Sequence, residues 1–458
     1  MYAVLLIVLA VAVTGCGNDT AVVEGSITVP DQYSTIQEAI DAAEDGDTIV
    51  VKPGKYSERI NFNGKNITLS STDPNNPEVR AETIIDAGGS GSVVIFESGE
   101  TERAVITGFT IIGGSGSLRA LEFEIEGVLE EISAYYGGGI LIVNNSSPTI
   151  ANNVIVDNVA ERGGGLLIFA SAPIIIDNEI SDNISTAGGG GFFIADSAAT
   201  ISGNKITNNA AGRSGGAIAL SGDGDFPTSF DGNTIADNRA ENGAAFTIFQ
   251  SNPLITNNSI INNSASERGG GFYMVMSSPQ ITNNDISDNS AAISGGGVAV
   301  HFESSPTLEG NIIVSNDAAE GGGISIYYRS NPLIEKNTIS ANQALNGGGI
   351  VINEDSAPQI TGNEIIGNIV ERNGAGIFVQ AAAPIIEGNS IRNNEARRDG
   401  GGIYAVLNAV VTVSGNVFEN NRASQGGAIR TLEAAVLQLE SPDDNTYQGN
   451  VPNDIFQD

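Results

Sequence analysis

Short apolar stretches recur along most of the chain, and within each stretch apolar and other side chains alternate. One copy of the pattern, residues 321–346, reads GGGISIYYRSNPLIEKNTISANQALN, and the next begins at residue 347 with GGGIVINEDSAPQITGNEIIGNIVER. Each copy holds three such stretches, of the forms Gly-Gly-Gly-Ile-x-Ile, Pro-x-Ile and Asn-x-Ile. Alternation with a period of two residues is typical of β-strands and not of helices. The pattern therefore predicts three short strands in each copy.

The glycine clusters fix the length of the repeat. Most are 26 residues apart, with one interval of 28 and one of 27, and they begin at Gly137, Gly163, Gly189, Gly215, Gly243, Gly269, Gly295, Gly321, Gly347, Gly374, Gly400 and Gly426. Gly and Asn separate the apolar stretches, and both tolerate the left-handed backbone of sharp corners. Repeats of this length, each stacked on the next, form a parallel β-solenoid. We expect an all-β parallel β-helix with three strands per coil over residues 137–432.

Two sets of repeated positions have structural roles in such a coil. The inward position of the first strand is apolar in all twelve copies, at Ile140, Leu166, Phe192, Ile218, Phe246, Phe272, Val298, Ile324, Ile350, Ile377, Ile403 and Ile429. The asparagines that open the third stretch, beginning with Asn153, Asn178 and Asn204, stack one strand spacing apart. Their amides can then bond from coil to coil in a ladder. We interpret these asparagines as structural and not as a binding site.

The segment before the repeats predicts a cap. Ser34 and Gln37 fit a capping box, and apolar residues follow at helical spacing until Gly46. We expect a helix over residues 35–45 that covers the open edge of the solenoid, because an unpaired edge invites polymerisation. Apolar stretches between residues 47 and 112 predict about three irregular coils. Residues 433–458 are expected to close the other end.

Near the start of the sequence an apolar run, AVLLIVLAVAV, occupies residues 3–13, and it ends in VTGC at residues 13–16. The run suits the apolar part of a signal peptide and is short for a membrane span. The segment resembles a bacterial lipoprotein signal, which implies lipidation of Cys16 and attachment to a membrane outside the cytoplasm. The expected organisation is a signal at 1–16, a tether at 17–26, cap and irregular coils at 27–136, regular coils at 137–432 and a C-terminal cap at 433–458.

The stretch VPDQYSTIQEAIDAAEDGDTIVVKPGKYSERINFNGKNITLSS resembles the N-terminal cap of right-handed β-helix surface proteins and pectin methylesterases. From residue 27 to about residue 445 the chain resembles the right-handed parallel β-helix, or pectin-lyase-like, superfamily. The GGAI segments at Gly215 and Gly426 and FENN at Phe418 are similar to the repeats of polymorphic outer-membrane adhesins. This resemblance implies the fold. It does not select an activity, because the superfamily includes lyases, hydrolases, esterases, epimerases, tailspikes and adhesins.

Charge and motifs narrow the classes of partner and reaction. Lys and Arg number 20 against 54 Asp and Glu, so the net charge is −34, which disfavours nucleic acid as a partner. The chain lacks the catalytic signatures of pectin methylesterases, polygalacturonases and alginate epimerases of this superfamily. A possible calcium site is Asp223, Asp225 and Asp231, although calcium requires six to eight oxygen ligands. The one histidine, His301, is expected on an outward, exposed face.

The outward face of the first strand is unusually apolar and aromatic for a surface that meets solvent. Such a stripe favours recognition, because aromatic rings on a rigid ladder suit stacking on sugar rings. The candidate contact residues are Leu141, Phe193, Phe249, Tyr273, Tyr327, Phe378 and Tyr404. Alternatively, residues 115–136 cover this face or two chains pair through it. The acidic pair Glu130 and Glu131 within that insertion is expected in a solvated loop or a short helix.

The function predicted from these observations is binding of a polysaccharide or another cell-surface component, without catalysis and without a required cofactor. A polysaccharide lyase or glycoside hydrolase with an atypical site is the first alternative. A structural stalk is the second.

Overall fold

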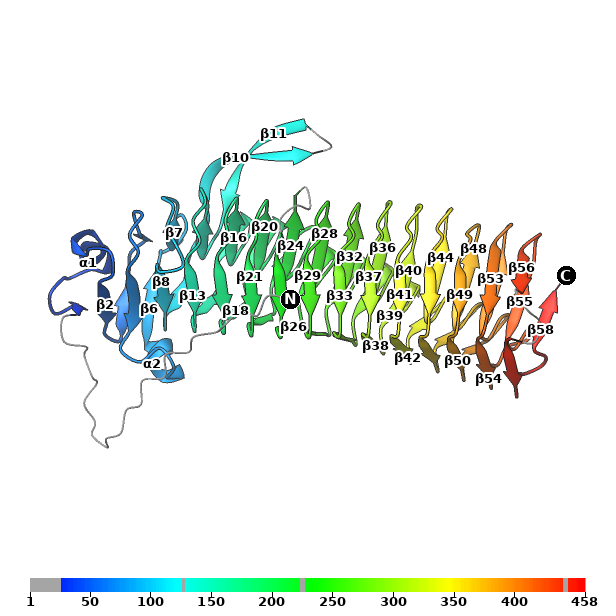
Figure 1. Cartoon of the computed structure of the whole chain (residues 1–458). Helices are drawn as coiled ribbons and strands as arrows, with labels where there is room; N and C mark the ends of the chain where they lie inside the picture. Colours follow the sequence, from blue (N-terminus) through cyan, green and yellow to red (C-terminus); the bar gives the residue numbers. More distant parts are fainter. Residues whose placement is uncertain (1–25, 126–127, 223–226, 440–443, 458) are drawn as a thin grey trace.

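Successive coils of the chain stack into an elongated right-handed β-solenoid (Figure 1). A computed structural model describes residues 26–125, 128–222, 227–439 and 444–457. A regular coil contains β12 (Ile140–Ile142), β13 (Thr149–Ala151), β14 (Val154–Val156) and β15 (Val159–Arg162). Each strand pairs in parallel with its equivalent in the next coil, as β12 does with β16 (Leu166–Phe169). The expected all-β parallel β-helix is confirmed.

Stacking of the coils produces four sheets within the described residues. We call them the first, second, third and fourth sheets after β12, β13, β14 and β15, and they contain 15, 16, 15 and 12 strands. The first three are the predicted ones. The fourth was not predicted, because its short strands alternate a small buried alanine, such as Ala265 or Ala291, with polar residues and contain no run of large apolar side chains.

The glycine cluster before each first-sheet strand meets two different demands of the backbone. Gly321 has a φ of 63°, in the left-handed region that favours glycine. Gly322 and Gly323 have no such φ but lie against neighbouring backbone. A Cβ atom on Gly322 would lie 2.2 Å from the carbonyl oxygen of Gln343, and one on Gly323 would lie 2.6 Å from that of Gly349. The cluster therefore lets the fourth sheet turn closely into the first.

The interior of the solenoid is apolar from end to end. All twelve inward positions predicted for the first sheet have a relative exposure of 0%. Isoleucines of the second and third sheets, such as Ile281 and Ile286, face them from the other walls and are equally buried. The predicted core is confirmed.

Two asparagine ladders brace the corners on either side of the third sheet. In the first, Asn284 donates from Nδ2 to Oδ1 of Asn311 at 3.0 Å, and Asn311 donates in the same way to Asn337 at 3.0 Å. In the second, Asn289 donates to Asn316 at 3.1 Å. All of these side chains are buried. The ladder predicted at Asn153, Asn178 and Asn204 is confirmed, and the parallel one begins at Asn158.

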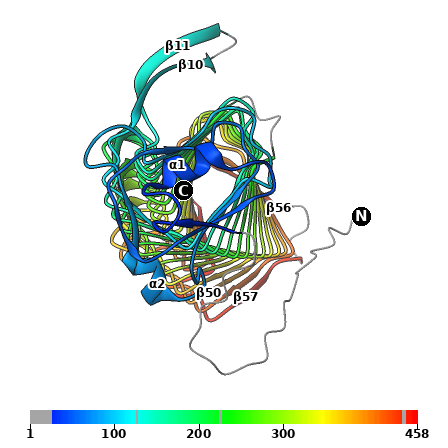
Figure 2. The ribbon, with the colours of Figure 1, turned by 90° about the vertical axis from the view of Figure 1, so that its left-hand side faces the viewer.

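Helix α1 (Ile36–Ala42) covers the N-terminal end of the tube, as Figure 2 shows from that side. The side chains of Ile36, Ala39 and Ile40, on the inner side of this helix, are fully buried. The helix is shorter than predicted and starts one residue later. Thr35 is its N-cap and accepts a bond from the amide of Glu38 at 3.1 Å, so the capping residue is not Ser34.

The remaining segments around the regular coils also form strands. Strands β2 (Thr48–Val51) to β9 (Thr110–Ile112) supply the irregular early coils, with a short outer helix, α2 (Pro77–Glu82), between two of them. At the other end, β56 (Val436–Leu439), β57 (Thr446–Gln448) and β58 (Ile455–Gln457) pair with the preceding coil. The described residues between 433 and 457 thus add a further coil to the stack.

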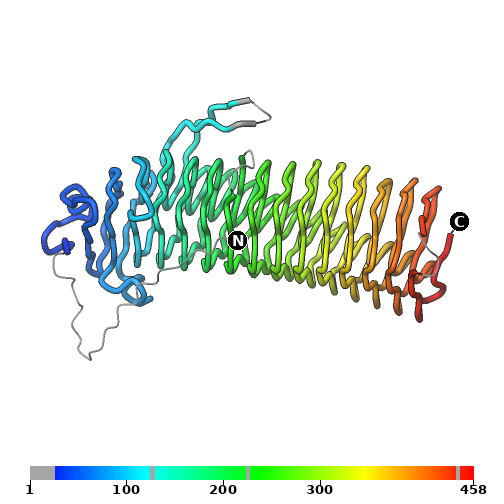
Figure 3. The backbone as a smooth tube through the Cα atoms, in the orientation of Figure 1, coloured from blue at the N-terminus to red at the C-terminus, as the bar shows by residue number. Residues whose placement is uncertain are grey.

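The insertion at residues 115–136 leaves the stack as an antiparallel hairpin (Figure 3). Its strands are β10 (Ser117–Ile125) and β11 (Val128–Tyr136), and they begin the fourth sheet. The expectation of a loop or short helix around Glu130 and Glu131 is wrong. Both residues lie in β11, where their side chains are exposed.

Candidate functional site

The outward face of the first sheet is mostly buried, so the prediction of an exposed apolar stripe is wrong. Of the seven candidate residues, five are at most 9% exposed and two are partly exposed. The buried ones are Leu141, Phe193, Tyr327, Phe378 and Tyr404, and the partly exposed ones are Phe249 and Tyr273. Their role in binding stays a prediction, and the accessible aromatic surface lies elsewhere.

The fourth sheet is one physical reason for this burial. Its strands lie beside the first sheet at a concave corner, and their last residues cover the outward side chains. Arg162, at the end of β15, lies over the ring of Phe193 at 5.3 Å. Glu320, at the end of β39 (Asp317–Glu320), accepts a hydrogen bond from the hydroxyl of Tyr327. Sequence periodicity could place these side chains outward but could not show the sheet that covers them.

The hairpin is the second reason, and it covers the N-terminal third of the face. Phe123 projects from β10 onto the first sheet, where its ring lies 5.2 Å from Phe169 and 6.2 Å from Phe193. Leu121 and Tyr136 complete the same buried cluster with Leu141. The alternative in which residues 115–136 cover part of the face is therefore correct.

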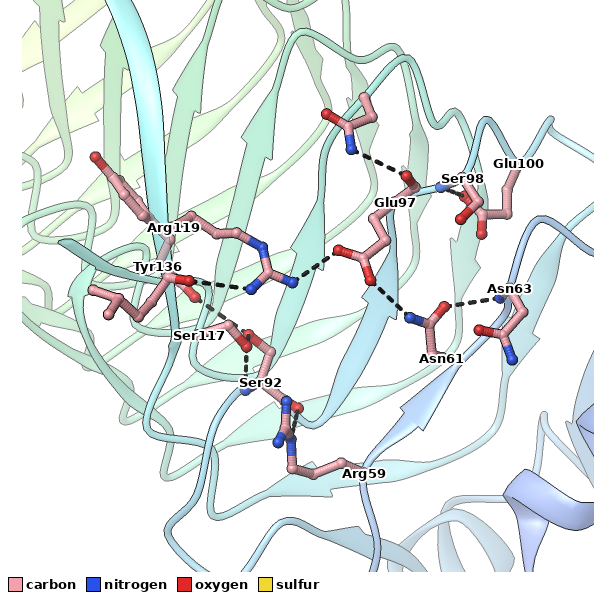
Figure 4. A network of polar contacts seen from close by, with 12 residues as sticks. Arg59, Asn61, Asn63, Ser92, Glu97, Ser98, Glu100, Ser117, Arg119 and Tyr136 are labelled. Atoms are coloured by element: carbon pink, nitrogen blue, oxygen red, sulfur yellow. Dashed lines mark hydrogen bonds and ion pairs between the residues drawn. The ribbon is translucent and has the colours of Figure 1, made fainter. Parts of the chain in front are cut away.

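A polar network holds the base of the hairpin to the early coils (Figure 4). Arg119 of β10 pairs with Glu97 at 2.8 Å, and Glu97 accepts a bond from Nδ2 of Asn61 at 2.9 Å. Ser92 donates to Ser117 at 3.0 Å. Both charged groups of the ion pair are partly exposed, so it contributes little stability by itself. Its effect is to orient the hairpin, while the apolar contacts of Phe123 hold it down.

His301 is buried, contrary to the prediction of an exposed surface residue. It ends β36 (Val298–His301) on the outward face, as alternation predicted, but is only 2% exposed. Aromatic rings surround its imidazole, with centroids 4.9 Å away for Tyr327 and 5.6 Å for Tyr273. Burial, with the nearby charge of Arg268, lowers the pKa of His301 to about 3. The ring is therefore neutral at physiological pH and is unsuited to general acid catalysis there.

The accessible aromatic surface lies at the corner that follows the first-sheet strands. Phe302 and Tyr328 occupy equivalent positions in adjacent coils and are each 42% exposed. Their rings stack at 4.5 Å between centroids, inclined by only 6°. Met276, in the preceding coil, is 37% exposed at the same position. Sequence reasoning missed these three residues because it followed the alternation along the strand and not into the turn. The signal that could have found them is the adjacent aromatic pairs His301-Phe302 and Tyr327-Tyr328 at the strand ends.

The backbone aims these side chains into solvent. Phe302 and Tyr328 have φ values of 50° and 56°, and the residues after them, Glu303 and Arg329, are also left-handed. Bulky residues rarely adopt this conformation. Two consecutive left-handed residues make the corner one residue longer than at Met276, where only one is present. The lengthened corner projects beyond the strand and presents its side chains on the outside of the tube.

A groove of about 640 Å³ crosses this corner over four successive coils. It follows the ends of β32 (Phe272–Val275), β36, β40 (Ile324–Ile326) and β44 (Ile350–Asn353). Its lining residues are Val275, Met276, Phe302, Glu303, Tyr328, Arg329, Glu354 and Asp355. We call it the corner groove. Apolar and aromatic side chains together with a few charged groups are the usual make-up of a small-ligand site.

Charge is distributed unevenly along the corner groove. Arg329 and Glu303 form an exposed ion pair at 2.9 Å. Glu354 and Asp355 follow one coil further on and are exposed. Partial burial and the neighbouring carboxylates of Asp355 and Glu320 raise the pKa of Glu354. The end of the groove near residue 354 is therefore negative.

The predicted calcium site is not assembled by the residues that can be seen. Asp223 and Asp225 lie outside the described residues, and Asp231 is exposed and accepts bonds from Thr256 at 3.0 Å and Asn257 at 2.8 Å. Across the described part of the chain, no three Asp, Glu, His or Cys side chains are grouped closely enough to hold a metal ion. Cys16 also lies outside the described residues.

Comparison with known proteins identifies the family. The family model described as "Right handed beta helix region" matches residues 58–227, 175–322, 216–381 and 319–451, so the chain belongs to the right-handed β-helix family. No curated protein sequence matches the chain. In the described segments, no helix is long and apolar enough to cross a membrane.

Several solved structures are similar to this chain at low sequence identity. The catalytic unit of a GH87 α-1,3-glucanase from Streptomyces thermodiastaticus is 14% identical with a TM-score of 0.42, over 93% of this chain and 70% of the glucanase. DFA-IIIase from Arthrobacter chlorophenolicus is 12% identical with a TM-score of 0.35, over 90% of this chain and 97% of that enzyme. The receptor-binding domain of the siphovirus 9NA tailspike is 11% identical with a TM-score of 0.25, over 93% of this chain and 76% of the tailspike domain.

Proposed function

We propose that this protein is a lipid-anchored β-helix of the cell surface that binds carbohydrate through the corner groove and does not transform it. The observation that carries the proposal is the exposed, stacked pair Phe302 and Tyr328 in an open groove of about 640 Å³. Exposed aromatic rings provide apolar faces on which sugar rings stack, and a rigid scaffold lowers the entropic cost of binding. His301 is buried behind these rings with a lowered pKa, so its imidazole is not exposed to a ligand in the groove.

Substitution of the two rings tests the proposal. The double variant Phe302→Ser, Tyr328→Ser removes the stacking surface from an exposed corner, so the fold is expected to persist while glycan binding falls at least tenfold. Leu407→Ser is the matched control, because Leu407 has the same left-handed corner position and the same exposure of 42% but lies outside the groove. Binding is measured on a glycan array and by calorimetry. Equal binding by the double variant and the control would refute the proposal.

The anchor is proposed on the sequence of residues 3–16 alone. If Cys16 carries the lipid, Cys16→Ser expressed in a bacterial host moves the protein from the membrane fraction to the soluble extracytoplasmic fraction and abolishes labelling by a fatty-acid analogue. Retention of label in the variant would exclude lipidation at this residue. Attachment would display the tube at the cell surface, where a glycan ligand is accessible.

A further inference from the structure

The corner groove carries more negative than positive charge. Three carboxylates, of Glu303, Glu354 and Asp355, line it together with one guanidinium, of Arg329. The guanidinium is engaged by Glu303 at 2.9 Å. Within the described residues, neither Glu354 nor Asp355 has a cationic side chain within ion-pair distance. Two carboxylates at one end of the groove are thus available to a ligand.

Charges around the corner groove add to its negative charge. Partial burial raises the pKa of Glu354, and the carboxylates of Asp355 and Glu320 raise it further, so Glu320 adds to the negative charge around this residue. The whole chain has a net charge of −34, so its long-range field also repels anionic polymers. A ligand rich in uronate groups would approach against both fields. A ligand with positive charge would be attracted by both.

The aromatic floor suits the same kind of ligand. Tyr328 and Glu354 occupy the same corner position in successive coils, which are about 4.8 Å apart. A sugar ring stacked on Tyr328 therefore lies within reach of both free carboxylates. The faces of Phe302 and Tyr328 also attract cations through their quadrupoles, by about 0.5–1 kcal/mol at exposed sites. Stacking and charge attraction thus favour the same ligand, a sugar that carries an ammonium group.

We propose that the corner groove selects glycans with free amino groups, of the 2-amino-2-deoxyhexose class, over their N-acetylated forms and over polyuronates. This inference rests on the proposed carbohydrate function and adds the chemical class of the glycan. The sugar ring stacks on the face of Tyr328 that Phe302 leaves free, and its ammonium group lies between the carboxylates of Glu354 and Asp355. A lysine-rich protein segment would satisfy the same carboxylates, so it forms one arm of the test.

The experiment uses calorimetry on the whole protein at low ionic strength and mildly acidic pH. The probes are a glucosamine hexamer, an N-acetylglucosamine hexamer, an oligogalacturonate and a lysine-rich peptide. We expect the glucosamine hexamer to bind about five- to tenfold more tightly than its acetylated form, the ratio that two partly exposed ion pairs supply. Added salt should reduce that ratio.

The variant Glu354→Gln, Asp355→Asn should bind both hexamers equally. Glu433→Gln is the control, since Glu433 is an exposed acid at the same left-handed corner position in a later coil. Equal or tighter binding of the acetylated hexamer or the galacturonate by the wild-type protein would overturn the inference and leave the proposed function standing. If the protein binds no sugar in calorimetry or on the glycan array, both the proposed function and this inference are overturned. Binding of the peptide alone would replace the glycan by a basic protein partner.

Discussion

The asparagine ladders allow the stability of the solenoid to be tested at a single side chain. Asn311 is 1% exposed, at the middle of the first ladder. Its Nδ2 donates to the carbonyl oxygen of Ile281 at 2.8 Å and to Oδ1 of Asn337 at 3.0 Å. Its Oδ1 accepts from the main-chain amide and from Nδ2 of Asn284, both at 3.0 Å. The substitution Asn311→Ala removes all four bonds.

The cost follows from what remains. Each hydrogen bond contributes about 1 kcal/mol net, so four of them give about 4 kcal/mol. The carbonyl of Ile281 and the amide of Asn284 then stay buried without these partners, which adds about 1–2 kcal/mol. We expect a loss of about 5–6 kcal/mol in the free energy of unfolding of the affected coils. The control Gln280→Ala, on an exposed strand position, should change stability by less than about 0.5 kcal/mol.

Two measurements are needed, because coils of a solenoid can open separately. Urea unfolding followed by circular dichroism gives the overall change. Hydrogen exchange followed by mass spectrometry locates it, and the faster exchange should centre on the coils that contain residues 284, 311 and 337. A stability of Asn311→Ala within about 0.5 kcal/mol of the control would refute the reasoning, because the ladder would then carry no net energy.

Two further predictions concern the covered face of the first sheet. The unfolded chain binds a proton at His301 below about pH 6.5, whereas the folded chain does so only near pH 3. The free energy of unfolding should therefore decrease by about 1.4 kcal/mol for each unit by which the pH is lowered from 6.5 towards 3. His301→Leu should remove this part of the pH slope in urea titrations at several pH values, and an unchanged slope would contradict the burial of the imidazole. Phe123→Ala should cost about 3–4 kcal/mol in docking of the hairpin, because the ring is 4% exposed among Phe169 and Phe193. Limited proteolysis should then cleave within residues 117–136 much faster than in a Glu122→Gln control, and equal rates would show that the hairpin is not held by this contact.

The inward positions and the ladders could be predicted because they depend on local alternation and on stacking at a fixed interval. Ile324 faces the interior whatever its distant neighbours are, and Asn311 meets Asn337 because each directly precedes the third-sheet strand of its coil, in two successive coils. Burial of Tyr327 depends instead on Glu320 in another sheet, which no period along the first strand reports. Leu121 and Phe123 alternate with acidic residues, as in a strand, but the density of charge led to the expectation of a loop or a short helix.

Variation along a solenoid is permitted where a residue has no obligatory partner in the coils on either side. The side chain of a strand residue packs against its equivalents in the coils on either side, which are about 4.8 Å away. Its replacement therefore changes the packing in three coils. A corner residue that points outward has no such constraint, and its side chain is free for recognition. Phe302 and Tyr328 occupy that position in a backbone conformation that costs bulky residues about 1–2 kcal/mol each. Packing inside the tube does not repay this cost, because both rings stand outside it. The same left-handed conformation occurs at Leu407 and Glu433, outside the groove, so it is a property of the corner and not of a binding site. What is particular to Phe302 and Tyr328 is that two large, exposed rings lie side by side there, and this is the physical reason to seek function at this corner and not along the strands.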